Sequence, residues 1–335
     1  MLPTHIRTPI CRSVSLSLAL TLALAASASA YVNDVASSGA SAIGSSSTQP
    51  LFQPCAQNGI RGQFGSSNVL SVGASVSLIN DLGLQSMNAN PQNGGAGSVV
   101  VGSETDPVDS DWRVSSTTFC ADLDAPAPDG NEEGYVKSVR IVHAQSAVNS
   151  ERKKGVGARC PEGMSVIGGG GDIDADGVTD LGFSLSTPFF GFGQPDGWNV
   201  AGHEVDPTDA DWQVEAKVIC ADLSTAGGAN TKFADDVEYV QSLSVFNSEG
   251  SKRQSARCPD GKKVIGGGAD VEFPSKGPGF PGPADVTLKR SQPGGDDPTS
   301  TAWKAHAVET DGTSADWQLR STAVCATLHV LPQSK

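Results

Sequence analysis

The sequence predicts an all-β protein made of three tandem, antiparallel, β-sandwich-like units with one disulfide in each. The first observation is alternation: apolar and polar residues follow each other with a period of two over 212–220, the pattern of a half-buried strand. The second is composition, since the chain has 39 glycines, few methionines and no long helical pattern. The third is repetition, because the same motifs return three times at nearly constant spacing.

The repeat divides the chain at its three tyrosines. Tyr31, Tyr135 and Tyr239 are each followed by valine and stand 104 residues apart. Further along each copy, an Asp-Trp pair precedes a cysteine at a constant interval. The predicted divisions are a signal peptide (1–30), a degenerate first β repeat (31–134), a second repeat (135–238) and a third repeat (239–335).

Two arrangements of these units agree with the pattern. In the first, each unit of about 100 residues has five or six strands and its own core, and the units follow one another like beads. The polar segments 124–134 and 224–236, rich in proline and glycine, have the composition of connectors and favour this arrangement. In the second, the units form the walls of a single pseudo-threefold body that resembles a β-prism.

The N-terminus predicts export. Arg7 and Arg12 precede an uncharged apolar run at 13–26, and the small-x-small sequence Ala28-Ser29-Ala30 follows it. This run has 14 residues, whereas a helix needs about 20 to span a bilayer. We therefore expect no membrane span, a mature chain that begins at Tyr31, and a secreted, extracellular or periplasmic location.

The charge of the chain bears on its partners. The formal net charge is −14, and removal of the leader makes it more negative. Such a surface repels phosphate backbones and anionic lipid, so we expect neither nucleic acid nor a membrane surface as a partner. Where carboxylates converge, the same charge suits hard cations.

Six cysteines remain after the leader, and an even number in an exported chain indicates disulfides. Spacing alone allows fifteen pairings, which the repeat reduces to two symmetric schemes. The favoured scheme pairs cysteines within each unit, as Cys55–Cys120, Cys160–Cys220 and Cys258–Cys325. The rival scheme links successive units through Cys120–Cys160 and Cys220–Cys258 and returns from Cys325 to Cys55.

Unit 1 departs from the other two at two places. It has Ser98 where units 2 and 3 have Trp198 and Trp303. It also lacks the glycine triples that those units carry at 168–170 and 266–268. Because successive glycines in a strand often mark the close approach of another group, we expect each tryptophan to rest on its glycine triple. No helical pattern follows either triple, so a phosphate-binding loop is not indicated.

Units 2 and 3 share a longer motif: Cys-Pro-x-Gly-x-x-Val-Ile-Gly-Gly-Gly, then Ser-x-Pro, then Trp, then Cys-Ala. It occupies 159–170, 186–188, Trp198 and 220–221 in unit 2, and 257–268, 291–293, Trp303 and 325–326 in unit 3. This pattern resembles a repeat of secreted bacterial proteins that have no established activity. The resemblance implies export and a repeat architecture, and it implies no catalytic residues.

An acidic loop in unit 2 is a candidate calcium site. Carboxylates stand at its first, third, fifth and ninth positions and a glycine at its sixth, as in oxygen-rich loops that bind Ca²⁺. The candidate ligands are Asp172, Asp174, Asp176 and Asp180. Phe183 stands where an EF-hand has its bidentate glutamate, and the ending resembles the calcium loops of integrin-type propeller repeats instead. A solvated acidic turn explains the same residues.

Each unit also carries three carboxylates close to an Asp-Trp pair. These candidate ligands for a cation or a sugar are Glu104, Asp106 and Asp111; Glu204, Asp206 and Asp211; and Glu309, Asp311 and Asp316. A turn between two strands explains the threefold repetition equally well.

Catalytic motifs of the GxSxG, HExxH and CxxC kinds do not occur in the sequence. His203 beside Glu204 is the acid–base pairing that the sequence offers. We therefore expect a non-catalytic protein that binds a glycan or surface polymer outside the cell, since the acidic edge beside a tryptophan recurs three times. A structural envelope or matrix protein is the second hypothesis. A secreted hydrolase, which needs one unique site, is the third.

Overall fold

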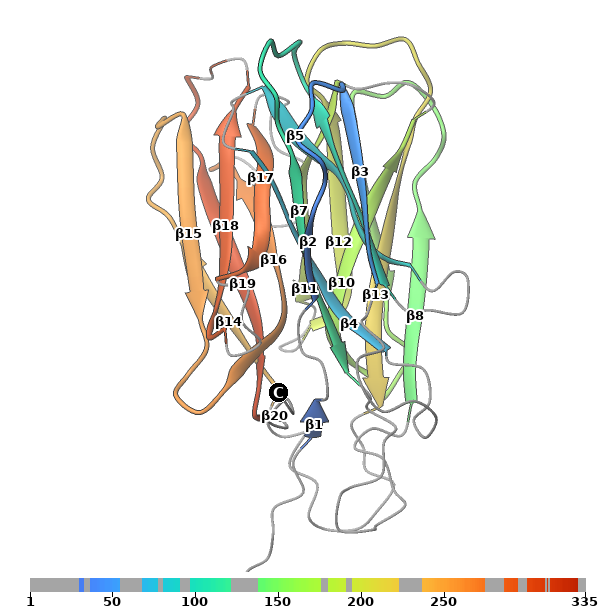
Figure 1. Cartoon of the computed structure of the whole chain (residues 1–335), viewed down its shortest axis with the longest axis vertical. Helices are drawn as coiled ribbons and strands as arrows, with labels where there is room; N and C mark the ends of the chain where they lie inside the picture. Colours follow the sequence, from blue (N-terminus) through green and yellow to red (C-terminus); the bar gives the residue numbers. More distant parts are fainter. Residues whose placement is uncertain are drawn as a thin grey trace, which may run out of the picture.

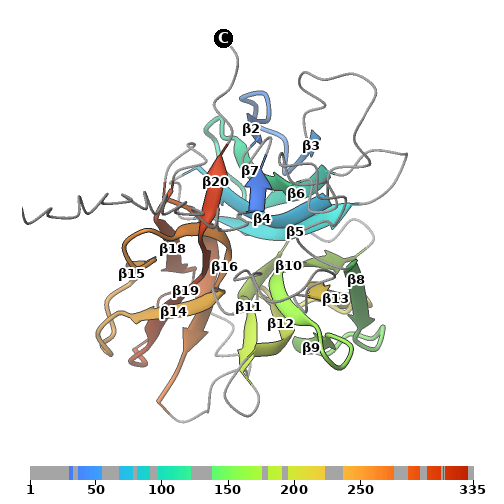
Figure 2. The same cartoon turned by 90° about the horizontal axis from the view of Figure 1, so that it is seen from below.

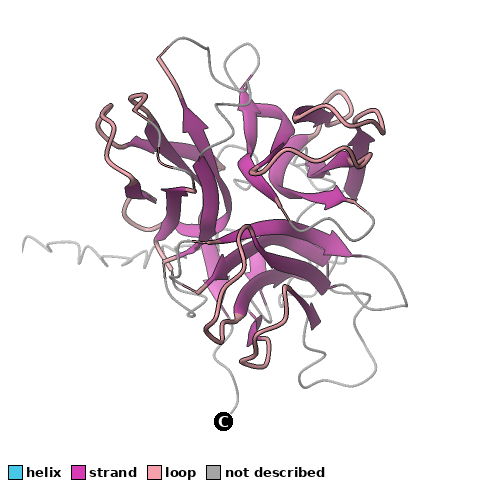
Figure 3. Cartoon of the chain, turned by 90° about the horizontal axis from the view of Figure 1, so that it is seen from above, coloured by secondary structure: helices cyan, strands magenta, loops and turns pink. Residues whose placement is uncertain are grey.

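The computed structural model describes residues 30–32, 37–54, 68–77, 81–90, 97–121, 138–175, 180–190, 195–222, 237–274, 286–294, 300–310, 312 and 314–330. Every regular element in these residues is a strand (Figure 1), and the strands surround a central axis (Figure 3). The predicted all-β class is therefore confirmed. Within these ranges we find no helix with the length and apolarity needed to cross a bilayer. The predicted signal peptide lies outside the described residues.

Each unit contributes six strands. Unit 1 contains β2 (Ser37–Ala40), β3 (Thr48–Pro54), β4 (Asn68–Val76), β5 (Leu82–Asn90), β6 (Gly97–Glu104) and β7 (Val114–Ala121). Unit 2 contains β8 (Ser138–Gln145), β9 (Lys153–Arg159), β10 (Ser165–Asp174), β11 (Leu181–Phe190), β12 (Pro195–Glu204) and β13 (Gln213–Asp222). Unit 3 contains β14 (Glu238–Leu243), β15 (Ser251–Arg257), β16 (Lys263–Glu272), β17 (Val286–Pro293), β18 (Ala302–Glu309) and β19 (Gln318–Ala326). The short β1 (Ala30–Val32) and β20 (Leu328–Val330) form a separate parallel pair.

The strands of one unit form two three-stranded layers that pack face to face, as in a sandwich. Each layer then continues into a layer of the neighbouring unit, which produces three six-stranded antiparallel sheets. The 1–2 sheet is β3-β6-β5-β10-β13-β8, the 2–3 sheet is β14-β19-β16-β11-β12-β9, and the 3–1 sheet is β15-β18-β17-β4-β7-β2. Figure 2 shows the three units, coloured blue to cyan, green to yellow and orange to red, around the common axis.

The predicted antiparallel, sandwich-like units are thus present, and their arrangement is the pseudo-threefold body rather than a row of beads. The physical reason is the inner edge of each layer. Strands such as β10 and β11 would expose unpaired backbone N–H and C=O groups in an isolated unit. The neighbouring unit pairs those groups, because β10 hydrogen-bonds to β5 and β11 to β16.

The units meet along the axis through very short stretches of pairing. Between β5 and β10 the register has only Gly171 opposite Met87 and Asp172 opposite Ser86. Equivalent two-residue pairings join β11 to β16 and β17 to β4. On the axis itself, β4, β10 and β16 contact one another, as do β5, β11 and β17. The strands therefore cross at the axis instead of running side by side along their whole length.

Glycine is required where strands of two units cross. A Cβ on Gly170 would overlap the backbone carbonyl oxygen of Met87 in the neighbouring unit. A Cβ on Gly268 would lie 2.6 Å from the Cα of Thr187. Unit 1 keeps a glycine at this position, Gly73, although it has lost the rest of the triple. The last glycine of each triple thus belongs to the interface between units.

The middle glycine of each triple has a different neighbour. A Cβ on Gly169 would lie 2.6 Å from Cε3 of Trp198, and one on Gly267 would lie 2.5 Å from Cγ of Trp303. Both indoles are fully buried. The predicted packing of each tryptophan on its glycine triple is therefore confirmed, and it is the middle glycine that makes room for the ring.

The core of unit 1 is filled by a different set of side chains. Strand register places Val72 at the position of Gly169 and Ser98 at the position of Trp198. Met87 stands at the position of Ser186, which accepts the hydrogen bond from the indole N–H of Trp198. Val72 and Met87 are buried. Ser98 Oγ lies 3.1 Å from Ser116 Oγ and also contacts Thr118 Oγ1. Unit 1 thus replaces one large ring by two smaller apolar side chains and a hydroxyl cluster.

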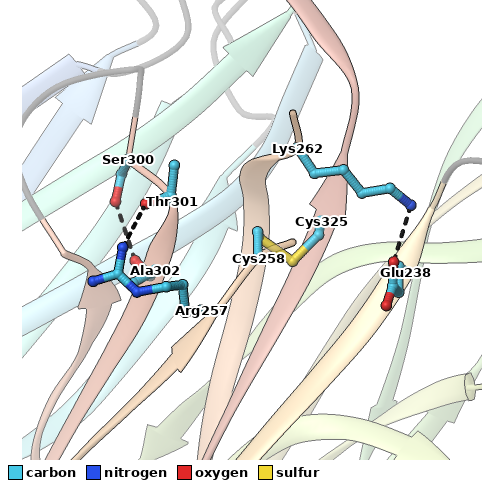
Figure 4. The surroundings of a disulfide bond; sticks show 8 residues. All are labelled: Glu238, Arg257, Cys258, Lys262, Ser300, Thr301, Ala302 and Cys325. Carbon is cyan, nitrogen blue, oxygen red and sulfur yellow. Dashed lines mark hydrogen bonds and ion pairs between the residues drawn. A yellow bond between two sulfur atoms is a disulfide. The ribbon is translucent and has the colours of Figure 1, made fainter. Parts of the chain in front are cut away.

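Two disulfides lie within the described residues, Cys160–Cys220 and Cys258–Cys325. They confirm pairing within units 2 and 3 and exclude the rival scheme, in which these cysteines link different units. Figure 4 shows Cys258–Cys325 with Lys262 reaching Glu238 and Arg257 reaching Thr301 beside it. The third predicted pair depends on Cys55, which lies outside the described residues.

Candidate functional site

The glutamate of each acidic cluster is part of the scaffold. Trp112 Nε1 donates a hydrogen bond of 3.0 Å to Glu104 Oε1, and Trp212 Nε1 does the same to Glu204 Oε1 at 3.0 Å. In unit 3, Trp317 Nε1 donates to Glu309 Oε1 at 2.9 Å. The indoles are buried, and Glu204 is fully buried as well. These tryptophans therefore present no ring on which a sugar can stack.

A buried lysine completes this arrangement in units 2 and 3. The Lys154 ammonium lies 4.8 Å from the centre of the Trp212 ring and donates to the carbonyl oxygen of Asn149 at 2.8 Å. Lys252 repeats both contacts with Trp317 and Asn247. Burial lowers the pKa of both lysines, an effect that nearby carboxylates oppose. Such cation–π contacts gain strength when they are removed from water.

Unit 1 makes the equivalent connection without a charge. Gln49 occupies the lysine position, and its Nε2 donates to the carbonyl oxygens of Gly44 at 2.8 Å and Trp112 at 2.7 Å. The same strands are therefore joined by an amide in one unit and by ammonium groups in the others. The Glu–Trp pair with its lysine or glutamine holds the strand ends together.

The aspartates of the acidic clusters are placed differently. Asp111, Asp206, Asp211 and Asp316 are exposed, Asp106 is half-buried, and Asp311 lies outside the described residues. Because the glutamates point into the core, the three carboxylates do not converge on one point in units 1 and 2, where the structure describes all three. A ligand role stays a prediction for the exposed aspartates alone.

The acidic loop of unit 2 is described in part. Asp172 and Asp174 lie on β10, Asp180 follows the loop, and Asp176 lies outside the described residues. Burial raises the pKa of Asp172, and a hydrogen bond from Ser86 partly offsets this. Asp174 Oδ2 accepts a hydrogen bond of 2.9 Å from Gln213 Nε2. In the described residues no three metal-ligating side chains come together, so calcium binding by this loop stays a prediction.

His203 does not form an acid–base pair with Glu204. Its ring is fully buried beside the axis, and Nε2 lies 3.1 Å from Oγ1 of Thr287 in the next unit. Burial, assisted by Lys153 and Arg152, lowers the pKa of His203 to about 3, so the ring is neutral. Alternation along β12 sends neighbouring side chains to opposite faces, and Glu204 instead faces Trp212.

The outer faces of the shared sheets point away from the tryptophans, and they combine exposed residues with residues buried near the axis, such as Ser86, Leu185 and Asp270. A row of six residues, one from each strand, crosses every sheet at the same position of the repeat. In the 1–2 sheet the row is Pro50, Val101, Ser86, Asp172, Glu215 and Gln145. In the 2–3 sheet it is Gly155, Ala201, Leu185, Asp270, Arg320 and Leu243. In the 3–1 sheet it is Arg253, His306, Arg290, Ser75, Ser115 and Ala40.

Charged side chains on each of the first two faces form ion pairs within the protein. In the 1–2 sheet, Glu215 lies 2.9 Å from Nδ1 of His143 and 3.0 Å from Nζ of Lys217. In the 2–3 sheet, Arg320 pairs with Glu272 and lies 3.8 Å from Oδ2 of Asp270. Burial raises the pKa of Asp270 to about 6 against the attraction of Arg320.

The 3–1 face has the opposite character. Its strands carry Arg253, Arg257, Lys289, Arg290 and Lys304, and their only carboxylate is Glu309, which is bound to Trp317. Sequence reasoning missed these basic residues because they lie on three separate strands of unit 3, β15, β17 and β18. The available signal was Ser75, a serine at the repeat position where the other units have aspartate. Its meaning depends on the pairing of β4 with β17, which the sequence does not reveal.

The chain matches no protein-family model and no characterised protein at a significant level.

Proposed function

We propose that this chain is a non-catalytic, extracellular protein that binds a glycan or surface polymer on the outer faces of its shared sheets. The observation that carries this proposal is the contrast between interior and outer rows. The Glu–Trp pair recurs in all three units. The six-residue rows on the outer faces differ from sheet to sheet. The row of the 1–2 sheet is apolar and acidic, the row of the 2–3 sheet is apolar and ion-paired, and the row of the 3–1 sheet is basic. Packing demands constrain the interior, whereas the exposed residues of the rows are free to serve different ligands.

The shape of these faces supports an extended ligand. Six strands spaced at about 4.8 Å give a sheet about 24 Å wide, which is broader than a pocket for one small molecule. Hydroxyl, amide and charged side chains lie along the rows, and these groups hydrogen-bond to sugar hydroxyl and acid groups.

The disulfides support the proposed location. Disulfides persist in oxidising compartments and are rare in the cytosol. Cys160–Cys220 and Cys258–Cys325 each close a loop within one unit. Together with the predicted leader they favour a protein that acts after export.

A binding screen with the whole mature chain tests this proposal. The chain from Tyr31 is applied to an array of neutral and acidic polysaccharides and bacterial envelope polymers, in millimolar calcium and in chelator. We expect saturable binding to at least one polymer class, with the polymer recovered unchanged. The absence of binding to every polymer would leave a purely structural role. New reducing ends after incubation would show hydrolysis, and either result would overturn the proposal.

A further inference from the structure

We propose that the outer face of the 3–1 sheet is a site for an anionic glycan, whose carboxylate or sulfate groups are held by Arg290 and Arg253. This inference rests on the proposed function, since it names one of the three faces and the class of polymer that this face takes. It concerns a surface built jointly by units 3 and 1, so neither unit contains it alone.

The first support is charge without compensation. Arg253 and Arg290 flank His306 across β15, β18 and β17. Arg113 joins Arg290 in lining a hollow of about 430 Å³ on this face. Within the part of the chain that the structure describes, none of the three guanidinium groups has a carboxylate partner. The carboxylate of Asp81 attracts the Lys289 ammonium group electrostatically, and it therefore offsets only that neighbouring charge.

The second support is the residue opposite Arg290. Arg290 pairs with Ser75 across the junction between units, and the equivalent positions in the other units are Asp172 and Asp270. Unit 1 therefore lacks the carboxylate that the repeat places at this junction. An acidic group of a ligand can take the position that the missing aspartate would occupy.

The third support is a pair of polar atoms without partners. Among the buried side-chain atoms, Arg290 Nε and His306 Nδ1 make no hydrogen bond. His306 is 4% exposed, and its Nε2 lies 3.0 Å from Ser251 Oγ. Buried polar atoms without partners are uncommon in native proteins and call for an explanation. Burial and then Arg253, Arg290 and Lys289 lower the pKa of His306 to about 4, which reports a positive local potential.

The remaining lining favours a sugar polymer over a nucleic acid. Ser75, Ser115, Thr117 and Gln292 line the same hollow as Arg113 and Arg290. These groups suit sugar hydroxyls, whereas single-stranded nucleic acids are bound on exposed aromatic rings. The lining residues that the structure describes include no aromatic ring. A second hollow of about 550 Å³ is lined by Ser251, Lys252 and Arg253 together with Glu249.

Matched polymers test the ligand class with the whole mature chain at low salt. Dextran sulfate is compared with dextran, and polygalacturonate with its methyl ester, so that each pair differs in charge alone. We expect binding to one or both anionic polymers, and binding to their neutral counterparts weaker by about tenfold or more. Binding of sulfate only or carboxylate only identifies the preferred acid and supports the inference.

Three variants test the site. Arg290→Gln and Arg253→Gln each remove a guanidinium, and Ser75→Asp restores the internal carboxylate opposite Arg290. Each should weaken anionic-polymer binding about tenfold or more. Arg140→Gln, at an exposed arginine of β8 in another sheet, makes the same change in net charge and should alter it less than twofold. Thermal unfolding checks that all four variants fold, and the two independent arginines keep the test valid if one of them does not.

The outcomes separate this inference from the proposed function. Binding to anionic polymers that all three site variants leave unchanged would overturn the inference alone. Binding to neutral polysaccharides only would do the same, while the proposed function would stand. Equal or tighter binding of polyphosphate or single-stranded DNA, lost in Arg290→Gln, would reject a glycan as the ligand. No binding to any polymer would overturn the proposed function first.

Discussion

Unit 1 and unit 2 share a backbone framework but fill the same part of the core in different ways. Unit 2 uses Trp198 over Gly169, with the indole N–H donated to Ser186 at 3.0 Å. Unit 1 has Ser98, Val72 and Met87 at the three equivalent positions. All three positions differ together, because a ring, the space that receives it and the acceptor for its N–H depend on one another.

The glycine that both units retain is next to the one that differs. Gly73 and Gly170 face the backbone of a neighbouring unit, whereas Val72 and Gly169 face side chains of their own unit. Side chains can be exchanged as a matched set, but a backbone atom of another strand cannot be made smaller. The comparison therefore distinguishes the part of the repeat that packs a unit from the part that assembles the body.

The largest expected effect comes from removing one member of the matched set. Trp198→Ala should lower the free energy of unfolding by about 3–5 kcal/mol, since it leaves a large cavity in the core. Adding Gly169→Val and Ser186→Met recreates the apolar filling of unit 1 and should recover a substantial part of the loss. Urea denaturation at equilibrium measures both changes. A triple variant less stable than Trp198→Ala would contradict the idea that these positions are exchangeable as a set.

A methyl group at the crossing of two units should cost nearly as much. Gly170→Ala places a Cβ against the carbonyl oxygen of Met87, which cannot move without distorting the sheet. We expect a loss of about 3 kcal/mol, at the upper end of the usual cost of overpacking. The matched control is Gly44→Ala, because a Cβ at Gly44 meets no atom within 4 Å. It should change stability by less than about 0.5 kcal/mol, and equal losses for the two variants would refute the crossing argument.

Asp270 extends the comparison to unit 3, where it stands at the position of Ser75. Its pKa of about 6 lies above the ordinary value of 3.8. Between these two pH values the carboxyl group therefore holds a proton in the folded chain that it releases in the unfolded chain. Its contribution to stability therefore falls as the pH rises from about 4 to about 6. Asp270→Asn should raise the free energy of unfolding by about 3 kcal/mol at pH 8 and change it much less at pH 4. Chemical denaturation at the two pH values measures this difference, and a gain independent of pH would rule out the buried carboxylate as its source.

The smallest expected effect concerns the acidic loop that unit 2 alone carries. If Asp172, Asp174, Asp176 and Asp180 bind Ca²⁺, the ion should stabilise the chain by about 1.4 kcal/mol at a concentration tenfold above Kd. The measurement is the calorimetric midpoint of the whole mature chain in calcium and in chelator, since the strands of unit 2 pair with both neighbours. An Asp174→Ala and Asp176→Ala double variant should lose the calcium response. The same shift in that variant would show that the loop is a solvated turn.

Several features followed from the sequence because they depend on spacing and local pattern. Alternation located strands such as β13, since a strand sends successive side chains to opposite faces. The repeat reduced the possible pairings to two symmetric schemes and favoured the one within units, which Cys160–Cys220 and Cys258–Cys325 confirm. The joint absence of Trp198 and Gly169 equivalents in unit 1 indicated their contact, because complementary volumes must change together.

Other features were decided by the tertiary structure alone. The sequence allowed separate units or a shared body, since the period of a strand does not say which neighbour its edge will pair with. Pairing of β17 with β4 put Ser75 opposite Arg290, so the hollow that Arg290 lines together with Arg113 exists only in the assembled chain. The acidic clusters suggested three sites of three carboxylates, but alternation and the indole N–H groups drew Glu104, Glu204 and Glu309 away from their aspartates. Spacing along the chain determined the units, and the pairing of their edges determined which side chains share a surface.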